Sequence, residues 1–321
     1  MDIVRREVEK ADRLSGFLIC SSLAGGTGSG VGAFCTERLR DEYAHACIVN
    51  PVVWPYASGE VILQNYNFIL TLSKLYEHSD ALIIFENDQL HEICTRIIES
   101  KKVGFDDLNS LISHKLASIL QPAYKNGRNE NFLNEIVTDL CSNSDYKLLT
   151  VNNVPQIHSN SVEYSTYQWP ALYKQAKQML ITGWFMDESL NWSVTSQKCK
   201  NKSIAASLFT RGTISSFEEG LNDEFFSKFN KINSNLYVDW NPCSFNVWNQ
   251  KRDFNRYSKS LTILSNSQSP VYKIDNLVAK AWKMFTSKAY VHQYVKHGFD
   301  EESFVNSFLF IEQLIKRYTN V

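Results

Sequence analysis

The sequence predicts an α/β fold built around a parallel sheet, and three observations indicate this class. Short apolar runs of strand length alternate with amphipathic helical patterns in the first half of the chain. The 321 residues contain only 13 glycines and seven prolines, so regular structure should dominate. Five of those glycines lie within residues 25–32, between an apolar run and a helical pattern, as in the first half of a βαβ unit.

The expected elements follow from these patterns in chain order. The charged start of the chain is typical of an amphipathic helix, and the apolar runs at residues 16–20, 47–54 and 81–85 are expected strands. A helix that opens at residues 106–107 and closes before Pro122 carries a wide apolar stripe and should be central. The second half should contain strands at residues 148–154, 204–210 and 261–265, and helices at residues 169–181 and 217–229. Two helices should end the chain, the last with Asp300 as its N-cap.

Composition excludes several classes of protein. With 33 basic and 34 acidic residues, the chain has no strong field to attract nucleic acid or an anionic membrane. Seven widely spaced cysteines without a C-x-x-C pair indicate neither a disulfide framework nor a zinc site, and they favour a reducing, cytoplasmic compartment. Residues 14–36 carry no charge, but their glycines argue against a membrane span.

The glycine cluster predicts a phosphate site. Bare backbone N–H groups can approach an anion there, and the helix that follows adds the positive end of its dipole. The residues concerned are Gly25, Gly26, Thr27, Gly28, Ser29 and Gly30.

Three other interpretations of the cluster can be weighed. A Walker loop requires a lysine, and none occurs between Lys10 and Lys74. The spacing Gly28-x-Gly30-x-x-Ala33 matches a dinucleotide fingerprint, but the next expected strand does not end in the acidic residue that would bind a ribose. A nicotinamide-dependent oxidoreductase is therefore a remote alternative, and a tight turn without a ligand is another.

The string at residues 24–30 resembles the signature of the tubulin family, and the resemblance continues in register to the C-terminus. Within that family the chain looks most like the delta-tubulins. The matching strings are residues 54–56, 59–67, 86–88, 107–109, 209–212, 245–248, 280–285 and 288–294.

The resemblance implies a tubulin-like arrangement of four parts. These are a partial GTP-binding domain of Rossmann type at residues 1–105, a central core helix at 106–123, an intermediate α/β domain at 124–270 and a C-terminal helical hairpin at 271–321. Tubulins place roughly one hundred residues ahead of the position of Met1, so we expect an unpaired sheet edge, poor solubility, and weak GTP binding or none by a chain that starts here. Met1 is accordingly expected to be internal to a longer protein or to begin a truncated gene model.

The same resemblance assigns a GTP site. The glycine loop would hold the phosphates, Asn87 and Asn109 would contact the guanine, and Phe105 would stack on the base. Glu60 and Gln64 would lie near the ribose, and magnesium would be bound through the segment that precedes Met1 in tubulins. Taken alone, Asn109 could equally be a solvated residue and Phe105 a hydrophobic staple.

In tubulins, hydrolysis is completed between subunits, and Glu135 occupies the position of the acid that acts on the neighbouring subunit's nucleotide. The resemblance therefore implies a GTPase that assembles with alpha, beta or epsilon tubulin and with microtubules. Its expected location is the cytoplasmic cytoskeleton, at centrioles and basal bodies. If Glu135 is only an exposed helical residue, the chain would instead be a scaffold or capping subunit without GTP turnover.

Overall fold

The computed structural model describes residues 1–59, 61–98, 103–125, 132–156, 168–183, 201–213, 236–242 and 244–321. The chain forms two compact units. The first contains Met1–Asp88, Asn143–Leu148 and Pro270–Asn320, and the second contains Gln89–Ser142, Leu149–Ser269 and Val321. The domain boundaries expected at residues 105 and 123 remain a prediction.

The first unit contains a parallel sheet with β3 (Ile48–Trp54) at its centre. On one side β3 pairs with β4 (Ala81–Glu86), in a register that sets Val49 opposite Ala81. On the other side it pairs with two short strands, β1 (Phe17–Leu18) and β2 (Ser21–Ser22). The parallel strands expected at residues 47–54 and 81–85 are thus confirmed.

The strand expected at residues 16–20 is present as β1 but has only two residues, and the second short strand β2 follows it after a break. The carbonyls of Cys47, Val49 and Val53 accept hydrogen bonds from this side of the sheet, so the odd-numbered residues of β3 face it. Pro51 is one of these residues and has no N–H to donate. The ladder is therefore interrupted opposite Pro51, between Leu18 and Ser21.

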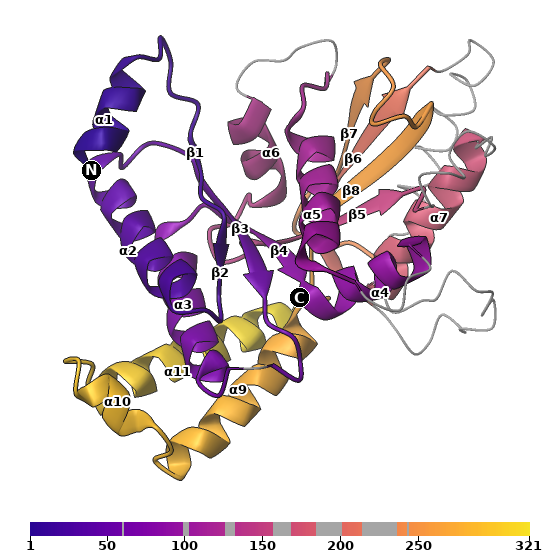
Figure 1. Ribbon diagram of the computed structural model, residues 1–321. Coiled ribbons are helices and arrows are strands. Elements are labelled where there is room, and N and C mark those ends of the chain that lie inside the picture. The colour runs from indigo at the N-terminus through magenta and orange to yellow at the C-terminus, as the bar shows by residue number, and fades with distance from the viewer. Residues whose placement is uncertain are drawn as a thin grey trace. The chain divides into compact units, whose positions relative to one another are not determined.

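Helices grouped around α3 provide most of the core of the first unit (Figure 1). The helix α3 (Gln64–His78) contacts α2 (Thr27–Glu42) as well as α9 (Val271–Thr286) and α11 (Glu301–Thr319). The remaining helices are α1 (Asp2–Glu9), α10 (Val291–Val295) and the start of α4 (Asn87–Ile98). The Asp300 carboxylate accepts the N–H of Ser303 at 2.8 Å, which confirms Asp300 as the N-cap of α11. The five-residue helix α10, between the two expected C-terminal helices, is an addition to the prediction.

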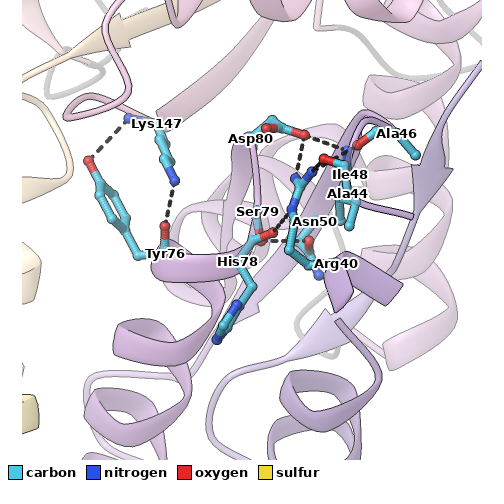
Figure 2. Close-up of polar contacts among 10 residues, drawn as sticks. All are labelled: Arg40, Ala44, Ala46, Ile48, Asn50, Tyr76, His78, Ser79, Asp80 and Lys147. Atoms are coloured by element: carbon cyan, nitrogen blue, oxygen red, sulfur yellow. Dashed lines mark hydrogen bonds and ion pairs between the residues drawn. The ribbon is translucent and has the colours of Figure 1, made fainter. Parts of the chain in front are cut away.

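Figure 2 shows a polar network at the amino ends of β3 and β4. Arg40, near the end of α2, donates to the Asp80 carboxylate at 2.7 Å, and the same carboxylate accepts the N–H of Ile48 at 2.7 Å. The other guanidinium N–H groups donate to the main-chain carbonyls of Ala44, Ala46 and His78. These bonds join α2, β3 and β4 at the end of the sheet away from the glycine cluster.

The second unit contains a mixed sheet in the order β5-β8-β6-β7. The strand β8 (Lys259–Ser267) runs antiparallel to both β5 (Leu148–Val154) and β6 (Ser203–Gly212), and β7 (Phe245–Gln250) runs parallel to β6. The helices of this unit include α5 (Phe105–Leu120), α6 (Phe132–Leu140) and α7 (Trp169–Thr182). The apolar face of α7 packs on β6 and β8 through Leu172, Ala176 and Leu180.

Most elements expected here are present, with two exceptions. The strand β7 was not expected, because its sequence alternates weakly, and the helix expected at residues 217–229 lies outside the described residues. Within the described part of the chain, the helices are all too short or too polar to cross a lipid bilayer.

Candidate nucleotide site

The glycine loop connects β2 to α2 at the carboxyl end of the parallel sheet. Leu23 donates its N–H to the carbonyl of Val53 at 3.1 Å, and the chain then turns into α2 with Gly26 as the N-cap. No side chain caps this helix, and the first N–H groups of any α-helix lack acceptors within the helix. Gly26 and Thr27 are exposed. The loop therefore presents unpaired backbone donors at the positive end of a helix dipole.

The glycines serve two separate purposes. A Cβ atom on Gly28 would lie 3.1 Å from the backbone nitrogen of Ser22, so this glycine allows α2 to approach β2 closely. Cβ atoms on Gly26 and Gly30 would meet no protein atom within 4 Å. The space in front of these two residues is thus open to a ligand.

Ser29 supports the loop from within. Its side chain is buried, and its hydroxyl donates to the carbonyl of Gly25 and, at 3.1 Å, to that of Gly26. The hydroxyl proton is therefore committed to the turn, so the donor that Ser29 can offer to a phosphate is its backbone N–H.

Asn67, in the first turn of α3, fixes the start of the loop. Its amide nitrogen donates to the carbonyls of Ala24 and Gly25, both at 3.2 Å, and its amide oxygen accepts the hydroxyl proton of Tyr294 at 2.6 Å. Burial and the nearby Tyr66 raise the pKa of Tyr294 to about 12, so the hydroxyl keeps its proton at neutral pH. Sequence reasoning gave neither residue a role, although both lie in the strings that match the tubulin family.

The Gln64 side chain packs against the segment at residues 55–59 and holds it by a hydrogen bond. Its side chain is buried and donates to the carbonyl of Tyr56 at 3.3 Å, while the backbone of Gly59 runs so close that any Cβ there would overlap the Gln64 amide. Asp88 accepts the N–H of Ala57 at 3.0 Å from the other side. Glu60, the other residue expected near a ribose, lies outside the described residues.

Asn87 lies at the same edge of the sheet as the glycine loop. It directly follows β4, whose carboxyl end is separated from that of β2 only by β3. Glu86, immediately before it, forms an ion pair with Lys273. Within the described part of the chain, the Asn87 amide has no hydrogen-bond partner in the protein, so both its donor and its acceptor can serve a ligand.

Phe105, Asn109 and Glu135 belong to the second unit. Phe105 begins α5 with 75% of its surface exposed, which argues against a hydrophobic staple. Asn109, one turn later, is also exposed. The Asp107 carboxylate accepts the N–H of Gly104 at 2.9 Å and so caps the helix that carries both residues. Their place beside the glycine loop remains a prediction.

Glu135 lies in the first turn of α6, half-buried. This helix is held by Phe132, whose ring packs edge-on against Trp248 at 5.1 Å between centroids. Lys125, in the basic stretch before α6, forms an ion pair with Asp139 at 2.6 Å and so anchors the same helix. Glu135 is therefore carried by a well-packed helix, while its proposed action on a neighbouring subunit remains a prediction.

Comparisons of the sequence with known proteins identify a matching family model and several relatives. Residues 1–95 match the family model of the GTPase domain of the Tubulin/FtsZ family. The chain is 42% identical to the tubulin delta chain of Macaca fascicularis and 41% identical to that of Homo sapiens, covering all of this chain and 74% of each relative. It is 27% identical to the tubulin beta-3 chain of Zea mays, over 99% of this chain and 69% of that relative. The expected delta-tubulin-like character is confirmed, and the chain belongs to the tubulin family.

Proposed function

We propose that the chain binds GTP, with its phosphates on the glycine loop and its base between Asn87, Asn109 and Phe105. The observation that carries this proposal is the open, glycine-lined start of α2, where backbone donors face free space. The asparagine amides supply both a donor and an acceptor, which suits the edge of a guanine. The exposed ring of Phe105 offers a stacking surface worth on the order of 1 to 3 kcal/mol, by analogy with base stacking on aromatic residues.

The proposed place of this activity is a cytoskeletal assembly. Its support is the identity to delta chains, which extends over the whole sequence. We infer that the chain acts as a delta-tubulin-like subunit in centrioles and basal bodies, with alpha, beta or epsilon tubulin as its partner in triplet microtubules. Among the described residues no three acidic, histidine or cysteine side chains are grouped to hold a metal ion, so we assign no magnesium ligand to them.

A competition experiment tests the nucleotide. Fluorescent mant-GTP is titrated into the purified chain and then displaced with unlabelled nucleotides at equal concentrations. GTP should displace the probe, while ATP should not, because the exocyclic amine of adenine offers a donor where guanine offers an acceptor. Displacement by NADH and not by GTP would favour the dinucleotide interpretation of Gly28, Gly30 and Ala33, and equal displacement by ATP would remove the proposed role of the asparagines.

Glu135 is proposed to polarise the water that attacks the nucleotide of a neighbouring subunit. Replacement with alanine should therefore reduce GTP turnover in assembled protein on the order of 100-fold and leave nucleotide binding unchanged. Phosphate release from assembled subunits measures the turnover. Glu312→Ala provides the control, because Glu312 is an exposed glutamate on α11. Unchanged turnover in Glu135→Ala would favour a scaffold or capping subunit.

A further inference from the structure

Three consecutive residues of α3 bind the C-terminal helical segment. Asn65 contacts the sulfur of Met284 at 3.7 Å, the Tyr66 hydroxyl donates to the carbonyl of Ala289 at 3.0 Å, and Asn67 accepts from Tyr294. Asn67 alone also reaches the glycine loop. A continuous chain of hydrogen bonds thus runs from α10 through one side chain to the backbone of the loop.

These hydrogen bonds also affect the directions in which the backbone N–H groups of the proposed phosphate site point. A carbonyl and the N–H that follows it share one peptide plane and point in opposite directions. Asn67 holds the carbonyls of Ala24 and Gly25, so it also sets the directions of the N–H groups of Gly25 and Gly26. The Tyr294 hydroxyl in turn supports the orientation of the Asn67 amide, because it donates to the oxygen and leaves the nitrogen for the loop.

The position of Tyr294 is itself well defined. Its ring packs edge-on against Phe304 at 5.1 Å and against Tyr66 at 5.8 Å between centroids. The segment before α10 contains Lys288 and Tyr290 with φ values of +53° and +60°, which non-glycine residues rarely adopt. Lys288 is held by Glu301 at 2.7 Å. Tertiary contacts therefore maintain an uncommon backbone that places Tyr294 against Asn67.

We propose that Tyr294 is a positioning residue for the glycine loop, which acts through Asn67 to aim the backbone donors of Gly25 and Gly26. The inference rests on the proposed GTP site. It assigns to the C-terminal segment a part in nucleotide binding, although that segment follows the loop by more than 200 residues in sequence.

The test compares two tyrosines that bind the same pair of segments. Tyr294→Phe removes the donor to Asn67, whereas Tyr66→Phe removes the donor to Ala289 and leaves the loop contacts intact. Hydrogen–deuterium exchange is measured in the nucleotide-free full chain at the amide of Gly30, whose N–H donates to the loop carbonyl of Gly26 at 3.0 Å and so reports on the order of the loop. Titration with mant-GTP follows. Both variants should lower the thermal midpoint. Only Tyr294→Phe should accelerate loop exchange and weaken mant-GTP binding, by about fivefold, as for one lost hydrogen bond.

A third variant tests whether Tyr294 acts on the loop through Asn67. In the background of Asn67→Ala, the Tyr294→Phe change should produce no further acceleration of exchange in the loop, because the intermediary is gone. Equal loop exchange in Tyr294→Phe and Tyr66→Phe would overturn the proposal, as would unchanged exchange in Tyr294→Phe. Failure of the unmodified chain to bind mant-GTP would refute the proposed nucleotide, while the exchange data would still decide the role of Tyr294.

Discussion

Gly28→Val should lower the affinity for mant-GTP by about 100-fold or more, because two misdirected charge-assisted hydrogen bonds amount to about 3 kcal/mol. The Cβ would lie 3.1 Å from the backbone nitrogen of Ser22 and 3.5 Å from its carbonyl oxygen, and valine adds two methyl groups beyond it. Backbone atoms of a paired strand cannot move aside as a flexible side chain can. The start of α2 must therefore shift away from β2, and the donors of the loop shift with it.

Gly30→Ala is compared with Gly28→Val for stability alone, because Gly30 faces the space assigned to the ligand and not β2. Gly30 lies on the same turn of α2, but its Cβ would meet no protein atom within 4 Å. Alanine is favoured over glycine in a helix by about 1 kcal/mol, so the thermal midpoint of Gly30→Ala should equal or exceed that of the unmodified chain. If Gly28→Val retains full affinity, the close approach of α2 to β2 has no bearing on the phosphate site. A fall in stability with Gly30→Ala would show that the helix start tolerates no side chain for other reasons.

The fold was largely predictable because its strands are buried on both faces. The segments β3, β4 and β5 are rich in apolar residues and almost entirely buried, and their observed limits lie within one residue of those expected. The helices α5 and α7 have wide apolar faces and clear end signals, including Pro122 after the first and Gly183, with φ of +58°, after the second. Local pattern and tertiary burial agree in these elements.

The elements that escaped prediction depend on tertiary contacts. The break between β1 and β2 reflects Pro51, which lies some thirty residues away in sequence and acts through strand pairing. The strand β7 is only partly buried and takes its position from β6, with Ala206 opposite Phe245. The helix α10 has five residues, too few for a periodic signal, and is maintained by packing around Tyr294.

The part of the candidate site that depends on backbone N–H groups, the glycine loop, could be predicted from the sequence. The glycine loop needs no side-chain partner to be recognised, whereas Asn87 was expected only from the resemblance to tubulins, and the structure shows that it directly follows β4. The contribution of Asn67 and Tyr294 could not be read from the sequence, because their hydrogen bond joins residues 227 positions apart. The loop backbone at Ser29 and the Gln64 position near a ribose remain predictions, and the side chains of both residues also donate to the surrounding backbone. A polar side chain beside a loop can bind a ligand or hold the surrounding backbone, and only the three-dimensional structure shows its contacts.

Arg211 binds the C-terminal end of α5, the helix that carries Phe105 and Asn109 near its start. Its side chain extends from β6, is only 3% exposed, and donates to the carbonyls of Ser118 at 3.0 Å, Gln121 at 2.5 Å and Pro122 at 3.3 Å. The carbonyl of Ser118 is one of those that α5 leaves without a partner in the helix, and those of Gln121 and Pro122 directly follow its C-terminus, where the helix dipole also favours a positive charge. Burial lowers the pKa of Arg211 to about 10, so the guanidinium remains charged at neutral pH.

Arg211→Met should accordingly reduce the free energy of unfolding by about 3 to 5 kcal/mol. Methionine fills much of the same volume but donates nothing, so the carbonyls of Ser118 and Gln121 lose the guanidinium as a partner, while that of Pro122 keeps the Gln250 amide at 3.2 Å. Urea unfolding followed by tryptophan fluorescence measures the loss. Arg252→Met is the matched control in the same unit, because Arg252 is exposed, and it should change stability by no more than about 0.5 kcal/mol. Equal effects of the two substitutions would mean that the buried guanidinium is not what secures α5, and that the exposed positions of Phe105 and Asn109 depend on other contacts.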